Sequence, residues 1–185
     1  MGSCRYIVRP SRFGEFGVVW QETDEGPKVC RVFLPRQDSA TVDQVRADFN
    51  NAPPGTCPPI SELGDRMRAF LEGEPIGFDI GIIARGQCSR FQKRVLFAEY
   101  KIPRGWVSTY SKIAAYLTVP KSVRAVGNAL AHNPFPIIIP CHRAVQSDGR
   151  LGGYQGGSAM KRALLEMEGV EFSRSGKLIT ARIYY

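Results

Sequence analysis

One cysteine in this chain has neighbours that could activate it for chemistry. Cys141 is followed directly by His142 and Arg143, at the end of the segment Asn133–Arg143, NPFPIIIPCHR. The thiolate is the attacking form of cysteine, and a nearby histidine or arginine lowers the pKa of the thiol from its usual value of about 8.5. These residue types therefore predict a nucleophilic cysteine with a lowered pKa.

The residues before Cys141 predict how it is held. Pro134, Pro136 and Pro140 fix their own backbone dihedrals and restrict the residues that precede them. We therefore expect an apolar strand that ends in a stiff turn at the cysteine. The alternative is an inert buried cysteine beside a surface histidine, because neighbouring side chains on a strand point in opposite directions.

Charge is distributed unevenly along the 185 residues. Residues 1–88 hold 10 Lys and Arg against 12 Asp and Glu, whereas residues 89–185 hold 15 against 5. A basic half of this kind is expected to meet a polyanion such as nucleic acid. The alternative is a basic surface that serves solubility only.

The remaining cysteines and the hydropathy narrow the class of protein. Four cysteines lie in the acidic half, without the short paired spacings of a zinc site, and both histidines lie in the basic half. A mixed Cys and His metal site in the first half is thereby excluded, while a four-cysteine site or a disulfide stays open. No apolar run approaches the roughly 20 residues of a membrane span, and no export signal begins the chain. We expect a soluble, intracellular protein.

The first half has the pattern of a small sheet covered by helices. Strands are predicted around Gly17–Glu22, Val29–Leu34 and Ile76–Ile83. Apolar residues at helical spacing predict two helices, one through Val42, Val45 and Phe49 and one through Leu63, Met67, Phe70 and Leu71, the latter capped by Ser61 and stopped by Gly73. Ala84–Ser89 is the best candidate for a linker, which gives an N-terminal α/β domain at 1–86 and a second domain at 87–185.

The second half is predicted to be mainly helical. One helix follows Phe91, Val95 and Leu96, and a second begins after Ser108 and ends at Val119-Pro120. A third begins at once, with Arg124 and Asn128 on its exposed face beside the small residues Ala125, Ala129 and Ala131. Two helices this close predict a helix-turn-helix, and small residues suit shallow docking on a narrow DNA groove. A plain amphipathic helix is the alternative.

The motif around the cysteine resembles a known family. PCHR at Pro140–Arg143 is similar to the active-site motif of the O6-alkylguanine-DNA alkyltransferases. The resemblance runs from Phe91 to Gly169 and includes IPRGWVSTYSKIAAYL, VPKSVRAVGNALAHNP and LGGYQGGSAMKRALLEMEG. The first half resembles the family's N-terminal domain in size and element order only. The resemblance implies an α/β (α+β) fold, with a ribonuclease-H-like sheet-plus-helix domain followed by a winged-helix or helix-turn-helix domain.

The resemblance also implies catalytic roles. His142 would act through a water as the base for Cys141 and would be oriented by Glu168, in the manner of a catalytic triad. Asn133 matches a hinge asparagine between the second DNA-binding helix and the active-site segment. Tyr110 matches a tyrosine that hydrogen-bonds the flipped base and a nearby phosphate.

Further positions are implied for DNA and for the base. Arg124 matches an arginine finger that fills the gap left by the flipped nucleotide. The base would meet the backbone nitrogen of Gln155 and the carbonyls of Cys141 and Ala144, with Tyr154 at its edge. The implied DNA-binding set is Tyr110, Lys121, Ser122, Arg124, Ala125, Asn128 and Ala129. The implied base pocket is Leu130, Ala144, Gly153, Tyr154, Gln155 and Gly156.

The function that this resemblance implies is direct repair of DNA. The alkyl group of O6-alkylguanine, and of O4-alkylthymine, would pass irreversibly to Cys141, and no metal or organic cofactor would take part. The protein is expected to be a monomer that binds double-stranded DNA and no membrane. It would be cytoplasmic, or nuclear in a eukaryote. Three alternatives are an alkyltransferase-like protein that binds the lesion without repair, a helix-turn-helix regulator, and a cysteine hydrolase. Alkyltransferase-like proteins have tryptophan where this chain has Cys141. A helix-turn-helix regulator would leave Glu168 and the glycine loop unexplained, and a cysteine hydrolase would need a nucleophile elbow, which this sequence lacks. Val170–Tyr185 is expected to form a short hairpin.

Overall fold

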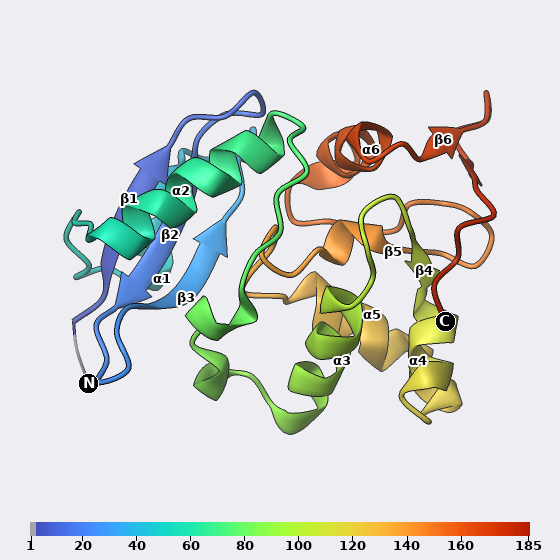
Figure 1. Ribbon diagram of the computed structural model, residues 1–185, viewed down its shortest axis with the longest axis horizontal. Coiled ribbons are helices and arrows are strands. Elements are labelled where there is room, and N and C mark those ends of the chain that lie inside the picture. Colours follow the sequence, from blue (N-terminus) through green and yellow to red (C-terminus); the bar gives the residue numbers. More distant parts are fainter. Residues whose placement is uncertain (1–2) are drawn as a thin grey trace. The chain divides into compact units, whose positions relative to one another are not determined.

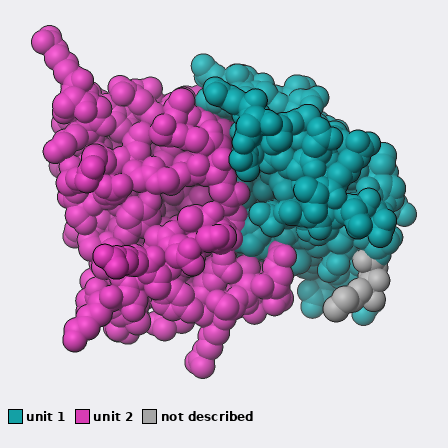
Figure 2. Space-filling view, turned by 180° about the vertical axis from the view of Figure 1, so that it is seen from behind, with its two compact units in different colours: residues 1–84, 134–138 teal, residues 85–133, 139–185 magenta. Residues whose placement is uncertain are grey.

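The computed structural model describes residues 3–185, which form two compact units. One unit runs to Ala84 and also includes Pro134–Ile138, and the other comprises Arg85–Asn133 and Ile139–Tyr185 (Figure 2). The boundary between Ala84 and Arg85 lies close to the linker that the sequence suggests. The short Pro134–Ile138 segment is an addition to the first unit that the sequence did not indicate.

The first unit is built on a three-stranded antiparallel sheet. Its strands are β1 (Arg5–Arg9), β2 (Phe16–Gln21) and β3 (Lys28–Phe33), joined in the order β1-β2-β3 (Figure 1). The two connections are tight turns that close at Gly14 and Gly26, both with positive φ. Every residue of β2 but the last is buried, as expected for the central strand of a sheet covered on both faces.

Helices α1 (Thr41–Asp48) and α2 (Pro58–Leu71) cover opposite faces of this sheet. A Cβ added to Gly17 in β2 would lie 2.9 Å from Thr41 of α1. On the other face, a Cβ added to Gly64 of α2 would lie 2.9 Å from Ile7, which pairs with Val18 of β2. Neighbouring residues of a strand point to opposite faces, so Gly17 and Val18 assign the two helices to the two faces.

The structure confirms two of the predicted strands and both predicted helices of this unit and corrects three details. Strand β1 was not predicted. The strand predicted at Ile76–Ile83 is wrong: the segment contains a 3₁₀ turn at Ile80–Ile82, where the Asp79 side chain accepts from the Gly81 N–H at 2.8 Å. Ser61 is not the N-cap of α2, because the helix begins at Pro58, where a proline needs no amide partner.

The second unit contains four helices and a short parallel strand pair. The helices are α3 (Arg90–Tyr100), α4 (Tyr110–Tyr116), α5 (Val123–Ala131) and α6 (Gly157–Met167), and the paired strands are β4 (Ser108–Thr109) and β5 (Ala144–Val145). Ser89 caps α3 by accepting from Gln92, and Thr109 caps α4 by accepting from Lys112. Helices α4 and α5, joined by a 3₁₀ turn at Pro120–Ser122, pack on each other and on α3 as the predicted helix-turn-helix.

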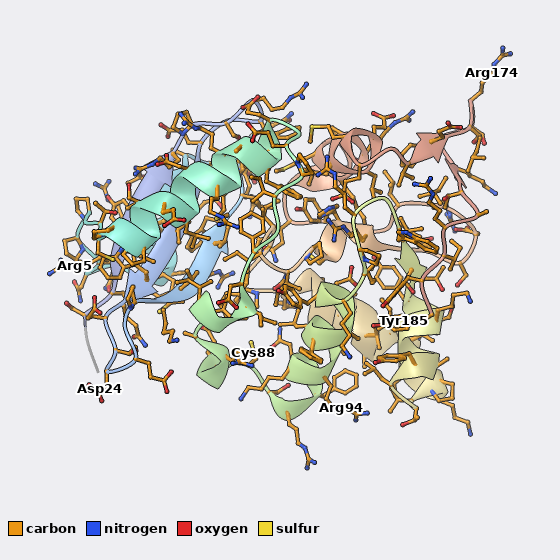
Figure 3. All side chains as sticks on the ribbon, in the orientation of Figure 1. Arg5, Asp24, Cys88, Arg94, Arg174 and Tyr185 are labelled. Carbon is orange, nitrogen blue, oxygen red and sulfur yellow. The ribbon has the colours of Figure 1, made fainter. Side chains whose placement is uncertain are left out.

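The C-terminal tail is a hairpin followed by an extended end, as the sequence suggested for its first part. Strands β6 (Glu171–Phe172) and β7 (Leu178–Ile179) pair antiparallel. The chain then runs beside Val107, whose N–H donates to Arg182 and whose carbonyl accepts from Tyr184. Tyr185 lies beside α4 and stacks on Tyr116 with ring centroids 3.9 Å apart (Figure 3). None of the helices within residues 3–185 is long and apolar enough to cross a membrane.

Candidate active site

Cys141 lies on a 3₁₀ turn, which confirms the turn predicted at the cysteine, but the segment before it is not a strand. The turn comprises Cys141–Arg143 and leads directly into β5, with the Arg143 N–H donating to the Pro140 carbonyl at 2.9 Å. The strand predicted for Asn133–Arg143 is therefore wrong, because its prolines remove donors that a strand ladder needs. With about three residues per turn, Cys141 and His142 are not forced onto opposite faces, which removes the objection raised by a strand.

His142, Arg143 and Glu168 form a buried network behind the cysteine. His142 Nε2 lies 3.0 Å from Glu168 Oε1, and Arg143 donates to both oxygens of Glu168 at 2.9 and 2.7 Å. A third Arg143 bond, 2.6 Å long, reaches the carbonyl of Ile102. Both partners of the His142–Glu168 pair are essentially inaccessible to solvent. The carboxylate thus fixes the orientation of the imidazole.

The protonation states of the pair suit a base. Burial, the largest influence, lowers the pKa of His142, so the ring is neutral near pH 7. For Glu168, burial alone would raise the pKa, but His142 and Arg143 outweigh it and hold the pKa at about 2. An ionised Glu168 favours the proton on Nε2 of His142, which leaves Nδ1 to accept a proton.

The thiol of Cys141 is protonated in this structure, contrary to the expectation from its neighbours. Burial raises its pKa to about 11, against the opposing hydrogen bond from Asn133 and the charge of Lys161. His142 is neutral and Arg143 is paired with Glu168, so neither lowers the pKa of the thiol as predicted. Activation therefore requires proton removal by a base.

Asn133 connects the end of α5 to the cysteine turn. Its side chain donates to the carbonyl of Ile139 at 3.1 Å and hydrogen-bonds the thiol of Cys141. Its own carbonyl accepts from the side chain of Gln155 at 2.6 Å. Gln155 thus holds the glycine loop to this junction through its side chain, an arrangement that the sequence did not suggest.

Tyr110 packs against the glycine loop, Leu151–Gly157. A Cβ placed on Gly152, whose φ is +71°, would lie 2.5 Å from the Tyr110 hydroxyl oxygen. Burial raises the pKa of Tyr110 to about 12, so the hydroxyl is a proton donor at neutral pH. Tyr154 of the same loop meets the His142 ring edge to face, with centroids 6.3 Å apart.

Two buried charged residues near the cysteine were missed by the sequence reasoning. Lys161 of α6 is fully buried and donates to the carbonyls of Ala144 at 2.7 Å and Gly153 at 3.3 Å. Glu99 of α3 is also fully buried. In α6, Lys161 is buried together with the apolar residues Met160, Leu164 and Leu165. A pattern based on hydropathy assigns charged residues to the surface and therefore could not find them.

The other predicted DNA-binding and pocket residues lie mostly on α5 and the glycine loop. Arg124, Ala125, Asn128 and Lys121 are exposed, and Ser122 is half-buried. Ala129 is only 7% exposed and faces the core, which corrects its assignment to the exposed face. Leu130 and Ala144 are buried, Gly153 is exposed, and Gly156 is the N-terminal cap position of α6.

No metal site accompanies these residues in the part of the chain that the structure describes. Between Ser3 and Tyr185, His, Cys, Asp and Glu side chains do not gather in a group of three or more that could hold an ion. None of the five cysteines, Cys4, Cys30, Cys57, Cys88 and Cys141, is joined in a disulfide. The Glu168 carboxylate is instead bonded to His142 and Arg143.

Fold and site together define a class: a helix-turn-helix protein with a buried cysteine beside a histidine–glutamate pair. Residues 90–170 match the family described as "6-O-methylguanine DNA methyltransferase, DNA binding domain". The methylated-DNA–protein-cysteine methyltransferase of Methanothermobacter thermautotrophicus is 42% identical over 156 residues, which are 84% of this chain and 80% of that protein. The chain therefore belongs to the methylated-DNA–protein-cysteine methyltransferase family.

Solved structures give the same result. The crystal structure of Mycobacterium tuberculosis OGT in complex with DNA is similar with a TM-score of 0.69 and 33% identity, over 89% of this chain and 92% of that one. The O6-methylguanine-DNA methyltransferase of Pyrococcus kodakaraensis is similar with a TM-score of 0.71 and 25% identity, over 89% and 99%. The mixed fold predicted from the sequence, a small sheet domain and a helical domain, is confirmed.

Proposed function

We propose that this protein repairs O6-alkylguanine in double-stranded DNA by moving the alkyl group irreversibly onto Cys141. The observation that carries the proposal is the buried His142–Glu168 pair beside a cysteine turn, in a chain related to methylated-DNA–protein-cysteine methyltransferases. Each protein molecule would react once, because the thioether that forms on Cys141 is chemically stable and the free thiol is not regenerated. O4-alkylthymine is a second expected substrate.

The residues supply each proton that the transfer needs. His142, oriented by Glu168, takes the thiol proton through a water as Cys141 attacks the alkyl carbon, so that a carbon–sulfur bond forms while the bond from carbon to O6 breaks. The departing guanine takes up a proton, for which the neutral hydroxyl of Tyr110 is the proposed donor. The base catalysis explains how a thiol with a pKa of about 11 can react near pH 7.

Access to the lesion requires the nucleotide to leave the DNA stack. Unstacking costs a few kcal/mol, part of which a side chain inserted in the gap can offset. Arg124 is suited to this role because it is exposed on α5 and has no ion pair within residues 3–185. Its small exposed neighbour Ala125 lets the helix backbone approach the minor groove, while Lys121, Ser122 and Asn128 flank it.

The flipped base is proposed to enter between the cysteine turn and the glycine loop. Its oxygen would meet the backbone nitrogen of Gln155, and its exocyclic amine the carbonyls of Cys141 and Ala144. The Ala144 carbonyl already accepts from Lys161, but a carbonyl oxygen has two lone pairs and can accept again. Leu130, Gly153, Tyr154 and Gly156 would complete the pocket.

Two organisational proposals accompany this function. Residues 87–185 would form the domain that binds DNA and carries the transfer, and residues 1–86 a separate domain; the division of the chain near Ala84 supports this. A cytoplasmic location, or a nuclear one in a eukaryote, suits a DNA substrate, and five cysteines without a disulfide agree with a reducing compartment.

Mass spectrometry of the intact protein tests the proposed transfer. Incubation with a duplex that contains one O6-methylguanine should add one methylene unit to the peptide that contains Cys141, with one equivalent repaired per protein molecule. Cys141→Ser should bind the duplex without gaining mass. Binding by the native protein without any mass gain would instead identify a lesion-binding protein, and repair beyond one equivalent would contradict a single-turnover reaction.

A further inference from the structure

Glu99 is a buried carboxyl group to which the mechanism above assigns no task. It lies on α3 and has no exposed surface. Neither of its oxygens has a hydrogen-bond partner within residues 3–185, and no Lys, Arg or His nitrogen among them comes within ion-pairing distance. A buried carboxylate without a partner is strongly destabilised, so the group favours its neutral, protonated form.

The charged and titratable groups around Glu99 belong to the proposed active site. Lys161 of α6 and Arg143 of the cysteine turn are the cations whose charges act on Glu99. Glu99 acts in turn on Cys141, on Tyr110 of α4 and on Tyr185 of the tail, and in each case its negative charge disfavours ionisation of the other group. Of the two cations, Arg143 is already bonded to Glu168.

Lys161 links Glu99 to the cysteine. Its ammonium donates to the carbonyl of Ala144, which follows the cysteine turn, and to the carbonyl of Gly153, which lies in the glycine loop. Its positive charge favours the Cys141 thiolate. While Lys161 is charged, a neutral Glu99 leaves that charge uncompensated; burial lowers the pKa of Lys161 to about 8, so this charge too is lost as the pH rises. An ionised Glu99 would offset it and would also repel a thiolate directly.

We propose that Glu99 is a positioning residue of the alkyl transfer, which acts on Cys141 through the local charge. While it is protonated, the Lys161 ammonium supports formation of the thiolate; when it loses its proton, the thiolate is disfavoured and the nucleophile is restrained. Burial, opposed by Lys161 and Arg143, raises the pKa of Glu99 to about 8, so the change falls just above neutral pH. The inference rests on the proposed function, since it takes Cys141 to be the nucleophile.

Iodoacetamide tests this proposal without DNA. The rate at which it modifies the Cys141 peptide, followed by mass spectrometry from pH 6 to 10, reports thiolate formation. The native protein should show a rate that rises with pH but bends to a shallower slope near pH 8. Glu99→Gln and Glu99→Leu should match it below pH 7, bend less, because only the loss of the Lys161 charge remains, and react about 3- to 10-fold faster at pH 9 to 10, which corresponds to a pKa difference of about half a unit to one unit.

Controls separate this effect from misfolding and from failure of the repair function. Glu166→Gln removes an exposed carboxylate from α6 and should keep the bend. Thermal unfolding verifies that each variant is folded, and the neutral amide and the apolar leucine should agree in direction. Rates at pH 9 to 10 that are no faster in either Glu99 variant than in the native protein would overturn the proposal. The expected iodoacetamide profile together with no methyl transfer from DNA would refute the repair function alone.

Discussion

Gly152 sets the distance between the glycine loop and Tyr110. Its φ of +71° is a conformation that side-chain-bearing residues rarely adopt, and a Cβ there would approach the Tyr110 hydroxyl to 2.5 Å. Gly152→Ala should therefore displace either the loop or the tyrosine. We expect the single-turnover rate of methyl transfer to fall at least 10-fold, measured with a duplex containing O6-methylguanine.

Gly86→Ala is the matched control for this change. Gly86 is exposed, and a Cβ there would meet no atom within 4 Å, so the rate should be unchanged. An unaltered transfer rate in folded Gly152→Ala would show that the contact between Tyr110 and the loop is dispensable for the reaction.

The residues of the site differ in how far the sequence could reveal them. Cys141 and His142 are visible because they are adjacent, and Glu168 was suggested by the family resemblance and then found 3.0 Å from His142. Glu99 and Lys161 could not be found in this way. Their burial depends on which face of α3 and α6 meets the cysteine turn, and hydropathy assigns charged residues to the other face.

At the scale of elements, long periodic segments were predicted well and short irregular ones were not. The helices of the helix-turn-helix follow from apolar residues at helical spacing, but Ile76–Ile83 and Asn133–Arg143 form turns despite their β-branched composition. In the first, the Asp79 side chain captures a backbone amide, and in the second, prolines remove ladder donors. Local hydrogen bonds thus outweighed strand propensity.

The C-terminal tail supports the elements that carry the site. Tyr185 stacks on Tyr116 of α4, and its hydroxyl donates to the Ala98 carbonyl of α3 at 2.9 Å. Tyr185→Ala should lower the free energy of unfolding by about 1–3 kcal/mol through loss of both contacts, and Tyr185→Phe by about 1 kcal/mol through loss of the hydrogen bond alone. Urea titration monitored by circular dichroism measures both.

The exposed residue Ile179 of β7 provides the comparison. It is 54% exposed, so Ile179→Ala should leave the midpoint of the urea transition nearly unchanged. Equal midpoints for Tyr185→Ala and the native protein would mean that the tail does not stabilise α3 and α4.

For the whole molecule, the composition predicted the kind of partner better than it predicted the architecture. The excess of basic residues in 89–185 pointed to a polyanion, and the chain proved to be related to DNA repair proteins. The inclusion of Pro134–Ile138 in the first unit could not be foreseen. A long-range hydrogen bond from the Val32 N–H to the Pro134 carbonyl joins this segment to β3, between residues that no local pattern relates.

The excess of basic residues in 89–185 predicts that the affinity for DNA depends on the salt concentration. Each phosphate that a lysine or arginine neutralises releases counterions, so the logarithm of the DNA affinity should fall linearly with the logarithm of the salt concentration, and removal of one phosphate contact should reduce that slope by about 1. Lys121→Ala, beside α5, should do so for an undamaged duplex in fluorescence anisotropy between 50 and 300 mM salt. Arg46→Ala removes an exposed charge from α1 in the acidic half and should leave the slope unchanged.

Arg124→Ala should reduce methyl transfer more than it reduces this non-specific affinity, because an arginine that fills the gap in the stack acts only after the nucleotide has flipped. Equal losses of transfer and affinity in Arg124→Ala would identify Arg124 as a phosphate contact instead.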